Sequence, residues 1–252
     1  MPYSYPQPVD RRRAPQVIRH LAPGALALAG TAGYINSVVL GFFHTPVSHM
    51  TGAVSHLGLD LAAGQFGDSQ ASLMIIGGYL AGALLAGLMV GARKLVPSRR
   101  YGFALFMEGL LLAVAAALFS VRHRLGLPVV ALACGLQNAM SSSYCGLAIR
   151  TTHVTGLVTD VGEMLGHWVR HREVDWFKLR FLVALFLAFG VGGFIGAFAD
   201  QRFGVRALLP AAVGCSVAGI ALWVLIDRGY LRLATDQLLD KDEPDPPSTG
   251  AR

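Results

Sequence analysis

The sequence contains few charged residues and few cysteines. Only 14% of its 252 residues are Asp, Glu, Lys or Arg, whereas soluble domains usually carry about 25%. The chain is therefore too poor in charge to cover a soluble surface, and neither an ordinary soluble enzyme nor a disordered chain is expected. Its three cysteines lie inside apolar runs without metal-ligand spacing, and their odd number does not indicate a disulfide framework.

Long apolar runs dominate the sequence. Hydrophobic residues make up 54% of the chain, and the mean hydropathy is +0.51. Because a helix needs about 20 apolar residues to cross a bilayer, six runs are long enough: 21–43, 71–92, 101–121, 125–149, 181–199 and 205–226. They predict an all-α membrane domain over 21–228. A basic N-terminal tail, 1–20, precedes it, and a polar tail that we expect to be disordered, 229–252, follows it.

Two further segments, 47–65 and 151–167, are moderately apolar and helical in character. They either cross the membrane, giving eight crossings, or form short re-entrant or interfacial helices, giving six. With six crossings and the N-terminus inside, 17 of the 21 basic residues fall on the inner side, against 14 with eight crossings. The positive-inside rule therefore favours six, with both termini in the cytoplasm. The net charge of +6 then belongs to membrane-flanking loops, and no nucleic-acid partner is expected.

The chain also repeats itself, with repeat one over about 21–121 and repeat two over about 125–228. The matching residues are Gly33 and Asn36 with Gly135 and Asn138, then His49, Thr51, Gly52 and Val54 with His153, Thr155, Gly156 and Val158. Each half contains three predicted crossings, and an odd number inverts the second half relative to the first. The sequence thus predicts an inverted 3+3 repeat, an arrangement found in transporters and channels.

Two polar residues, Asn36 and Asn138, occupy equivalent places inside apolar runs. An amide in this setting must face protein or water rather than lipid. One interpretation is a pair of substrate ligands; the other is a pair of hydrogen bonds between helices, each worth about 0.6–2 kcal/mol.

The Thr-Gly pairs, Thr51–Gly52 and Thr155–Gly156, stand where the short helices begin. A helix start has unpaired N–H groups and a partial positive charge. The Thr side chains can cap those groups while the glycines allow close packing, or the two starts can together bind an anionic substrate.

Three titratable residues are candidates for proton coupling. Glu108 is the only acid well inside a spanning run, about 10 Å deep from Tyr101 at 1.5 Å per residue. His49 and His153 precede the two Thr-Gly pairs and titrate near neutral pH, although either can simply bond a loop. No metal site is expected, because the histidines lack ligand spacing and accompanying carboxylates.

The "GLQNA" run at 135–139 and the "TTHVTG" run at 151–156 resemble the YoaK-like family of bacterial inner-membrane proteins, a domain of unknown function. The resemblance covers roughly 25–226 and implies a six-helix membrane protein. That family usually has Asp where this chain has Asn36, and Thr-Gly-Asn where it has Thr51, Gly52 and Ala53. If those positions carry an ion or a proton in the family, this chain has changed that step.

These observations lead to one expected function and one alternative. The expected function is a transporter or channel for a small solute, with an anion as one option, in the bacterial inner membrane. The alternative is a membrane scaffold or accessory protein that binds a partner through its helices. No cofactor is expected, and no enzyme, because the sequence contains no nucleophile elbow, metal motif or phosphate loop. Small-xxx-small glycine pairs are compatible with a homo-oligomer as well as with packing inside one chain.

Overall fold

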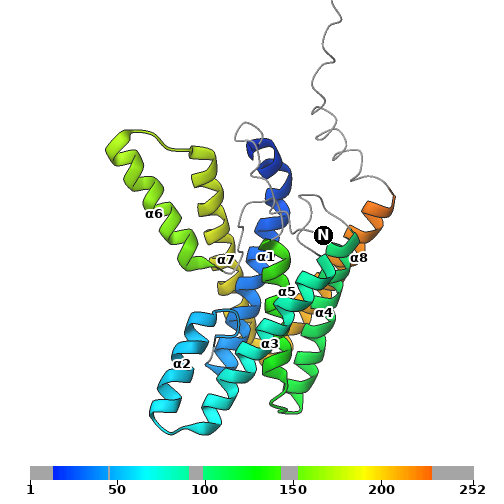
Figure 1. Ribbon diagram of the computed structural model, residues 1–252. Helices are drawn as coiled ribbons and strands as arrows, with labels where there is room; N and C mark the ends of the chain where they lie inside the picture. Colours follow the sequence, from blue (N-terminus) through cyan, green and yellow to red (C-terminus); the bar gives the residue numbers. More distant parts are fainter. Residues whose placement is uncertain (1–13, 45, 91–98, 143–152, 229–252) are drawn as a thin grey trace, which may run out of the picture.

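The computed structural model describes residues 14–44, 46–90, 99–142 and 153–228. This part of the chain is helical and contains no strand (Figure 1). Its elements are α1 (Ala14–Phe43), α2 (Met50–Ala62), α3 (Phe66–Val90), α4 (Arg99–Ser120), α5 (Gly126–Ser142), α6 (Val154–His171), α7 (Trp176–Phe203), η1 (Gly204–Ala207) and α8 (Leu208–Asp227).

Four stretches are long and apolar enough to cross a membrane. They are Ala22–Phe43, Phe66–Val90, Arg99–Ser120 and Trp176–Asp227. The last stretch comprises α7, η1 and α8, which are separate because the chain turns at Gly204, whose φ of +55° suits glycine. The shorter apolar helix Gly126–Ser141 corresponds to the fourth expected run, whose final residues lie outside the described part.

The two Thr-Gly segments form separate short helices, α2 and α6, as the sequence predicts. The expected bounds differ most in the second half. The second short segment was predicted to end at residue 167, but α6 continues through the following charged residues to His171 and ends at Arg172, which has a left-handed φ of 59°. Asp175 then caps α7, its carboxylate accepting from the backbone N–H groups of Phe177 and Lys178. The reason is the amphipathic sequence of α6, whose apolar side packs on α7.

Glycines set how the long helices pair. α1 packs along α7, where Gly192 touches the carbonyl of Gly30 and Gly196 touches that of Tyr34, so these two helices run parallel. α3 packs along α5, also in parallel: Gly78 lies against Pro128 and Gly82 against Leu132. α4 crosses α8 antiparallel, with Gly102 against Gly219 and Gly109 against Ala212. At each of these glycines a Cβ would collide with backbone, so the absence of a side chain permits the close approach.

The two short helices lie at opposite ends of the bundle. α2 forms a hairpin with α3 at the lower end in Figure 1, and α6 forms one with α7 at the upper end. We call the upper end, where Gly24, Tyr101 and Leu222 line one cavity, the near end. The end where α1 and α4 finish, at Phe43 and Ser120, is the far end.

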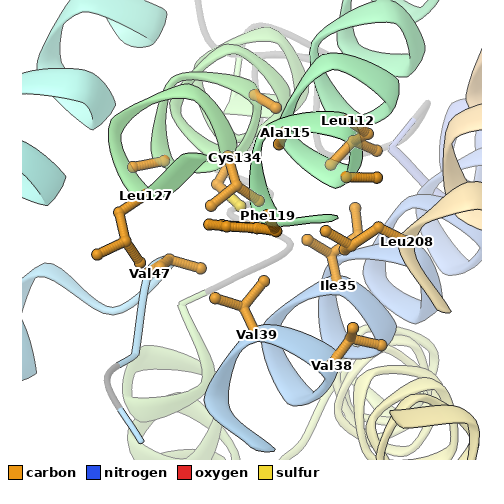
Figure 2. Close-up of a cluster of buried hydrophobic side chains, with 14 of the residues drawn as sticks. Ile35, Val38, Val39, Val47, Leu112, Ala115, Phe119, Leu127, Cys134 and Leu208 are labelled. Atoms are coloured by element: carbon orange, nitrogen blue, oxygen red, sulfur yellow. The ribbon is translucent and has the colours of Figure 1, made fainter. Parts of the chain in front are cut away.

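The largest apolar cluster fills the region between α1, α4, α5 and the start of α8, toward the far end. Figure 2 shows Ile35, Val39, Leu112, Phe119 and Leu208 converging there from different helices. The rings of Phe43 and Phe119 are in contact, with centroids 4.6 Å apart and the ring planes tilted by 48°. This cluster closes the far end of the bundle with side chains.

Candidate functional site

Asn36 and His49 are brought together by the segment between α1 and α2. After Phe43 the chain doubles back, so α2 begins beside Asn36, seven residues or about 10 Å before the end of α1. The buried Ser48 hydroxyl donates to Asn36 Oδ1 at 2.7 Å, and His49 Nδ1 lies 3.2 Å from the same oxygen. The Asn36 amide therefore binds residues of the segment that precedes α2, rather than a side chain on a second helix.

Asn138 has a different partner. Its Nδ2 donates to the hydroxyl of Tyr79 on α3 at 2.6 Å. The neighbouring Gln137, fully buried, donates through Nε2 to the carbonyl of Leu28 on α1 at 3.1 Å. Because α1 and α5 run in opposite directions (Figure 1), this bond places Asn36 and Asn138 about 13 Å apart along the helix axes. The two asparagines lie on opposite sides of the bundle centre and do not form one common site.

The Thr-Gly residues lie inside the first turns of α2 and α6, not at their caps. The N-cap positions are His49 and His153, and neither makes a side-chain capping bond, so the alternative in which Thr51 and Thr155 cap these helices does not hold. Thr51 and Thr155 are exposed. Gly52 lies against the ring of Pro46, and Gly156 against the ring of His153.

The starts of α2 and α6 lie on neighbouring turns of α7. The ring of His49 contacts Phe189 edge-on at 5.9 Å, and Leu157 of α6 packs in one cluster with Leu185. These two α7 residues are one turn apart, or about 6 Å. From this level the two short helices run toward opposite ends of the bundle (Figure 1).

Glu108 lies at the centre of the bundle. It stands nine residues, or about 13 Å, from the start of α4 and is completely buried. Among the described residues neither of its carboxyl oxygens has a hydrogen-bond partner. The thiols of Cys134 on α5 and Cys215 on α8 are close enough to interact with the carboxyl electrostatically, and Cys215 approaches it without the geometry of a hydrogen bond.

Two cavities meet near this carboxyl. The first, about 240 Å³, lies between α1, α4, α5 and α8 on the near side. The second, about 720 Å³, is a groove between α1, α7 and α8. Ala27, Thr31, Gly214 and Cys215 line both. Cys215 therefore stands between the two cavities and Glu108.

Sequence reasoning did not single out several polar residues that the fold uses. Gln137, Ser48 and Tyr79 hold helix contacts, and Asp200 near the end of α7 has one buried carboxyl oxygen without a partner in the described part. Gln137 had a usable signal, because it is an amide inside an apolar run. Tyr79 and Ser48 had none, since their role depends on which helix lies opposite. Across the described ranges, no group of three or more His, Cys, Asp or Glu residues is placed to hold a metal ion.

The residues that the structure describes form an all-helical fold around this buried carboxyl, and four of its apolar stretches have the length and composition of membrane-spanning helices. The sequence model of the family described as "Protein of unknown function (DUF1275)" matches residues 24–221, well over half of the chain, so the chain belongs to that family. This match is compatible with the YoaK-like resemblance. No curated protein and no solved structure matches the chain significantly.

Proposed function

We propose that this protein is a proton-coupled transporter of a small solute in the bacterial inner membrane, with both termini in the cytoplasm. Its membrane domain comprises six crossings, α1, α3, α4, α5, α7 and α8, with α2 and α6 as re-entrant helices. The observation that carries the proposal is Glu108, a completely buried carboxyl that has no hydrogen-bond partner among the described residues.

An acid in this position is costly. An ionised carboxylate away from water loses several kcal/mol of solvation, in order-of-magnitude terms, unless a cation or donors replace the water. Carboxyls inside membrane segments accordingly line the pathways of ions and protons. A scaffold gains nothing from Glu108 that a leucine of similar volume would not provide. A transporter uses such a group by binding a proton in one state and exchanging it against solute in another.

The helix pairing supports an inverted 3+3 repeat. Exchanging the two halves replaces α1 by α5, α3 by α7 and α4 by α8. The parallel pair α1–α7 then corresponds to the parallel pair α5–α3. In the antiparallel pair α4–α8 the two helices exchange places, so the pair is unchanged. The hairpin α2–α3 becomes α6–α7 at the opposite end. Pairing directions of this kind are expected when the halves are related by an axis in the membrane plane.

The equivalence of the two halves is broken at one place. α4 packs extensively along α5, whereas the equivalent helices α8 and α1 touch at few positions. The cavity of about 240 Å³ lies on the near side, between helices that include α1 and α8, while apolar side chains fill the far side. We assign this arrangement to a state open toward the near end, which is the cytoplasmic end in the proposed topology.

An anionic solute bound between the starts of α2 and α6 is the less favoured form of this proposal. Thr51 and Thr155 are exposed, neither side chain caps its helix, and the two asparagines lie about 13 Å apart. Glu108, in contrast, interacts with Cys215, which lines both cavities.

The test is solute-driven proton movement in proteoliposomes that contain a pH-sensitive dye. The panel comprises small carboxylates, amino acids, sugars and amines, each added as a gradient. We expect at least one solute to change the internal pH, and we expect Glu108→Gln to abolish that change. Glu163→Gln, at an exposed acid of α6, is the matched control and keeps wild-type rates.

Absence of any solute-dependent pH change in folded wild-type protein, across the panel, overturns the transporter proposal in favour of a scaffold. A pH change that Glu108→Gln leaves intact overturns the role of this carboxyl.

A further inference from the structure

We propose that the groove between α1, α7 and α8 is a lateral entrance from the bilayer, through which an amphiphilic amine reaches Glu108. The substrate class is a molecule with an apolar body and one basic amine. This inference rests on the proposed function, because it names the solute that the Glu108 site takes.

The groove has the chemistry of a site for an apolar body. Its volume is about 720 Å³, and its walls are aliphatic or glycine except for Thr31, Tyr34, Pro210 and Cys215. The Tyr34 hydroxyl donates to the carbonyl of Ala207 at 2.7 Å, so this group is already engaged. The walls therefore provide little to bind a strongly hydrated solute, whereas an alkyl or aryl body gains from contact with them.

The groove leads to the buried carboxyl. It shares Ala27, Thr31, Gly214 and Cys215 with the smaller cavity, and the Cys215 side chain is the one that approaches Glu108. Glu108 itself lines neither cavity, so in the proposed pathway the Cys215 side chain shifts to let the polar end of a ligand reach the carboxyl. The apolar part of the ligand then remains between α1 and α7, and its polar end lies at the bundle centre.

The carboxyl selects an amine. A carboxylate ligand would place two like charges side by side at low dielectric, which is strongly unfavourable. An alcohol can donate a hydrogen bond to the carboxyl, but it carries no charge and therefore cannot form an ion pair with a carboxylate. A neutral amine accepts the proton of the Glu108 carboxyl, and the product is an ammonium–carboxylate pair whose net charge is unchanged. When the ligand leaves as the ammonium ion, it takes this proton with it, and the carboxylate is reprotonated from water, so one proton moves with each amine.

In the part of the chain that the structure describes, the groove has no equivalent between the corresponding helices of the other half, so it does not follow from the repeat alone. In the other half the equivalent helices α4 and α5 are packed together. Among the described residues, one side of the bundle thus has a lateral groove where its counterpart is packed, as expected for an entrance rather than for two equivalent lipid-facing hollows.

The experiment uses the full chain in phosphatidylcholine vesicles with a photoreactive long-chain primary amine. Cross-linked positions are mapped by peptide mass spectrometry, and unlabelled dodecylamine, dodecanol and dodecanoate compete. We expect cross-links on the groove-lining segments of α7 and α8, with dodecylamine at least ten-fold more effective than the other two competitors. Glu108→Gln should remove this preference while cross-linking persists.

Two variants close the groove. Gly214→Phe is suitable because a Cβ at Gly214 meets no atom within 4 Å, and Val191→Trp because Val191 is 57% exposed. Both should abolish the cross-links. Gly190→Phe, at an equally open glycine of α7 that does not line the groove, is the control and should label as wild type does.

Equal competition by amine, alcohol and carboxylate would show that the groove holds acyl chains only, and would overturn the inference. Cross-links outside the groove, or cross-links that both closing variants leave intact, would overturn it too. Amine-selective binding to Glu108 without solute-driven proton movement would refute the transport proposal while leaving this binding site in place, so the two failures are distinguishable.

Discussion

Gly102 of α4 and Gly219 of α8 lie against each other's backbone carbonyl, so that each occupies the space that a side chain on the other helix would need. This reciprocal contact lies near the end of the antiparallel pair that crosses the bundle. It allows two backbones to approach closely with no side chain between them. In a membrane, where apolar residues gain little from leaving lipid, such packing is a main source of helix association.

The first prediction concerns this contact. Gly102→Leu forces α4 and α8 apart, and overpacking of this kind costs about 1–3 kcal/mol. We expect a lower Tm in detergent, measured by the loss of helical circular dichroism on heating. Gly87→Leu is the matched control, because a Cβ at Gly87 on α3 meets no atom within 4 Å. Equal Tm values for the two variants would show that the close contact between Gly102 and Gly219 does not stabilise the protein.

The second prediction concerns the amide that holds the start of α2. Asn36→Leu removes the acceptor for Ser48 and the contact with His49, so the segment before α2 loses its attachment to α1. We expect a loss of about 0.6–2 kcal/mol, together with faster proteolysis between α1 and α2. Ser55→Ala removes only a bond within α2, to the carbonyl of Thr51, and should leave both measurements near wild type. Wild-type proteolysis of Asn36→Leu would mean that other contacts fix this segment.

The third prediction concerns the orientation of the two hairpins. Gln65 precedes α3 and Glu173 precedes α7, and both side chains are exposed. In a background without native cysteines, we expect Gln65→Cys to react with an impermeant maleimide from outside the cell, and Glu173→Cys only after permeabilisation. The reason is that the α2–α3 and α6–α7 hairpins lie at opposite ends of the bundle. Labelling of both thiols from one side would refute the inverted arrangement.

Much of the fold could be predicted from the sequence because its signals are local. Apolar runs of about 20 residues predict long helices wherever the partners lie, and the two Thr-Gly segments did form α2 and α6. The end of α6 was misplaced because a charged segment looks like a loop when considered alone. In the fold its apolar side, including Leu157, Val161 and Met164, packs in one cluster with residues of α1 and α7.

The candidate site was predicted only in part. Glu108 was found because an acid in an apolar run is conspicuous. Its neighbours Cys134 and Cys215 were considered ordinary buried residues, since nothing in the sequence places the three side chains together. One interpretation of the two asparagines was a pair of ligands for a common substrate, but repeat symmetry places equivalent residues at equal distances on opposite sides of the axis. Only residues near that axis can meet.

The sequence by itself determined that this chain forms apolar helices, that two short helices interrupt them, and that an acid lies within one of the long ones. These properties depend on composition and on spacing along a single helix. The tertiary structure decided which glycines face which carbonyls. It also decided that α4 packs along α5 while α1 and α8 touch at few positions, and that Glu108 lies next to Cys215, which lines both cavities. Those relationships join residues far apart in the chain, and they depend on close contacts between helices, which the pattern of any one helix does not contain.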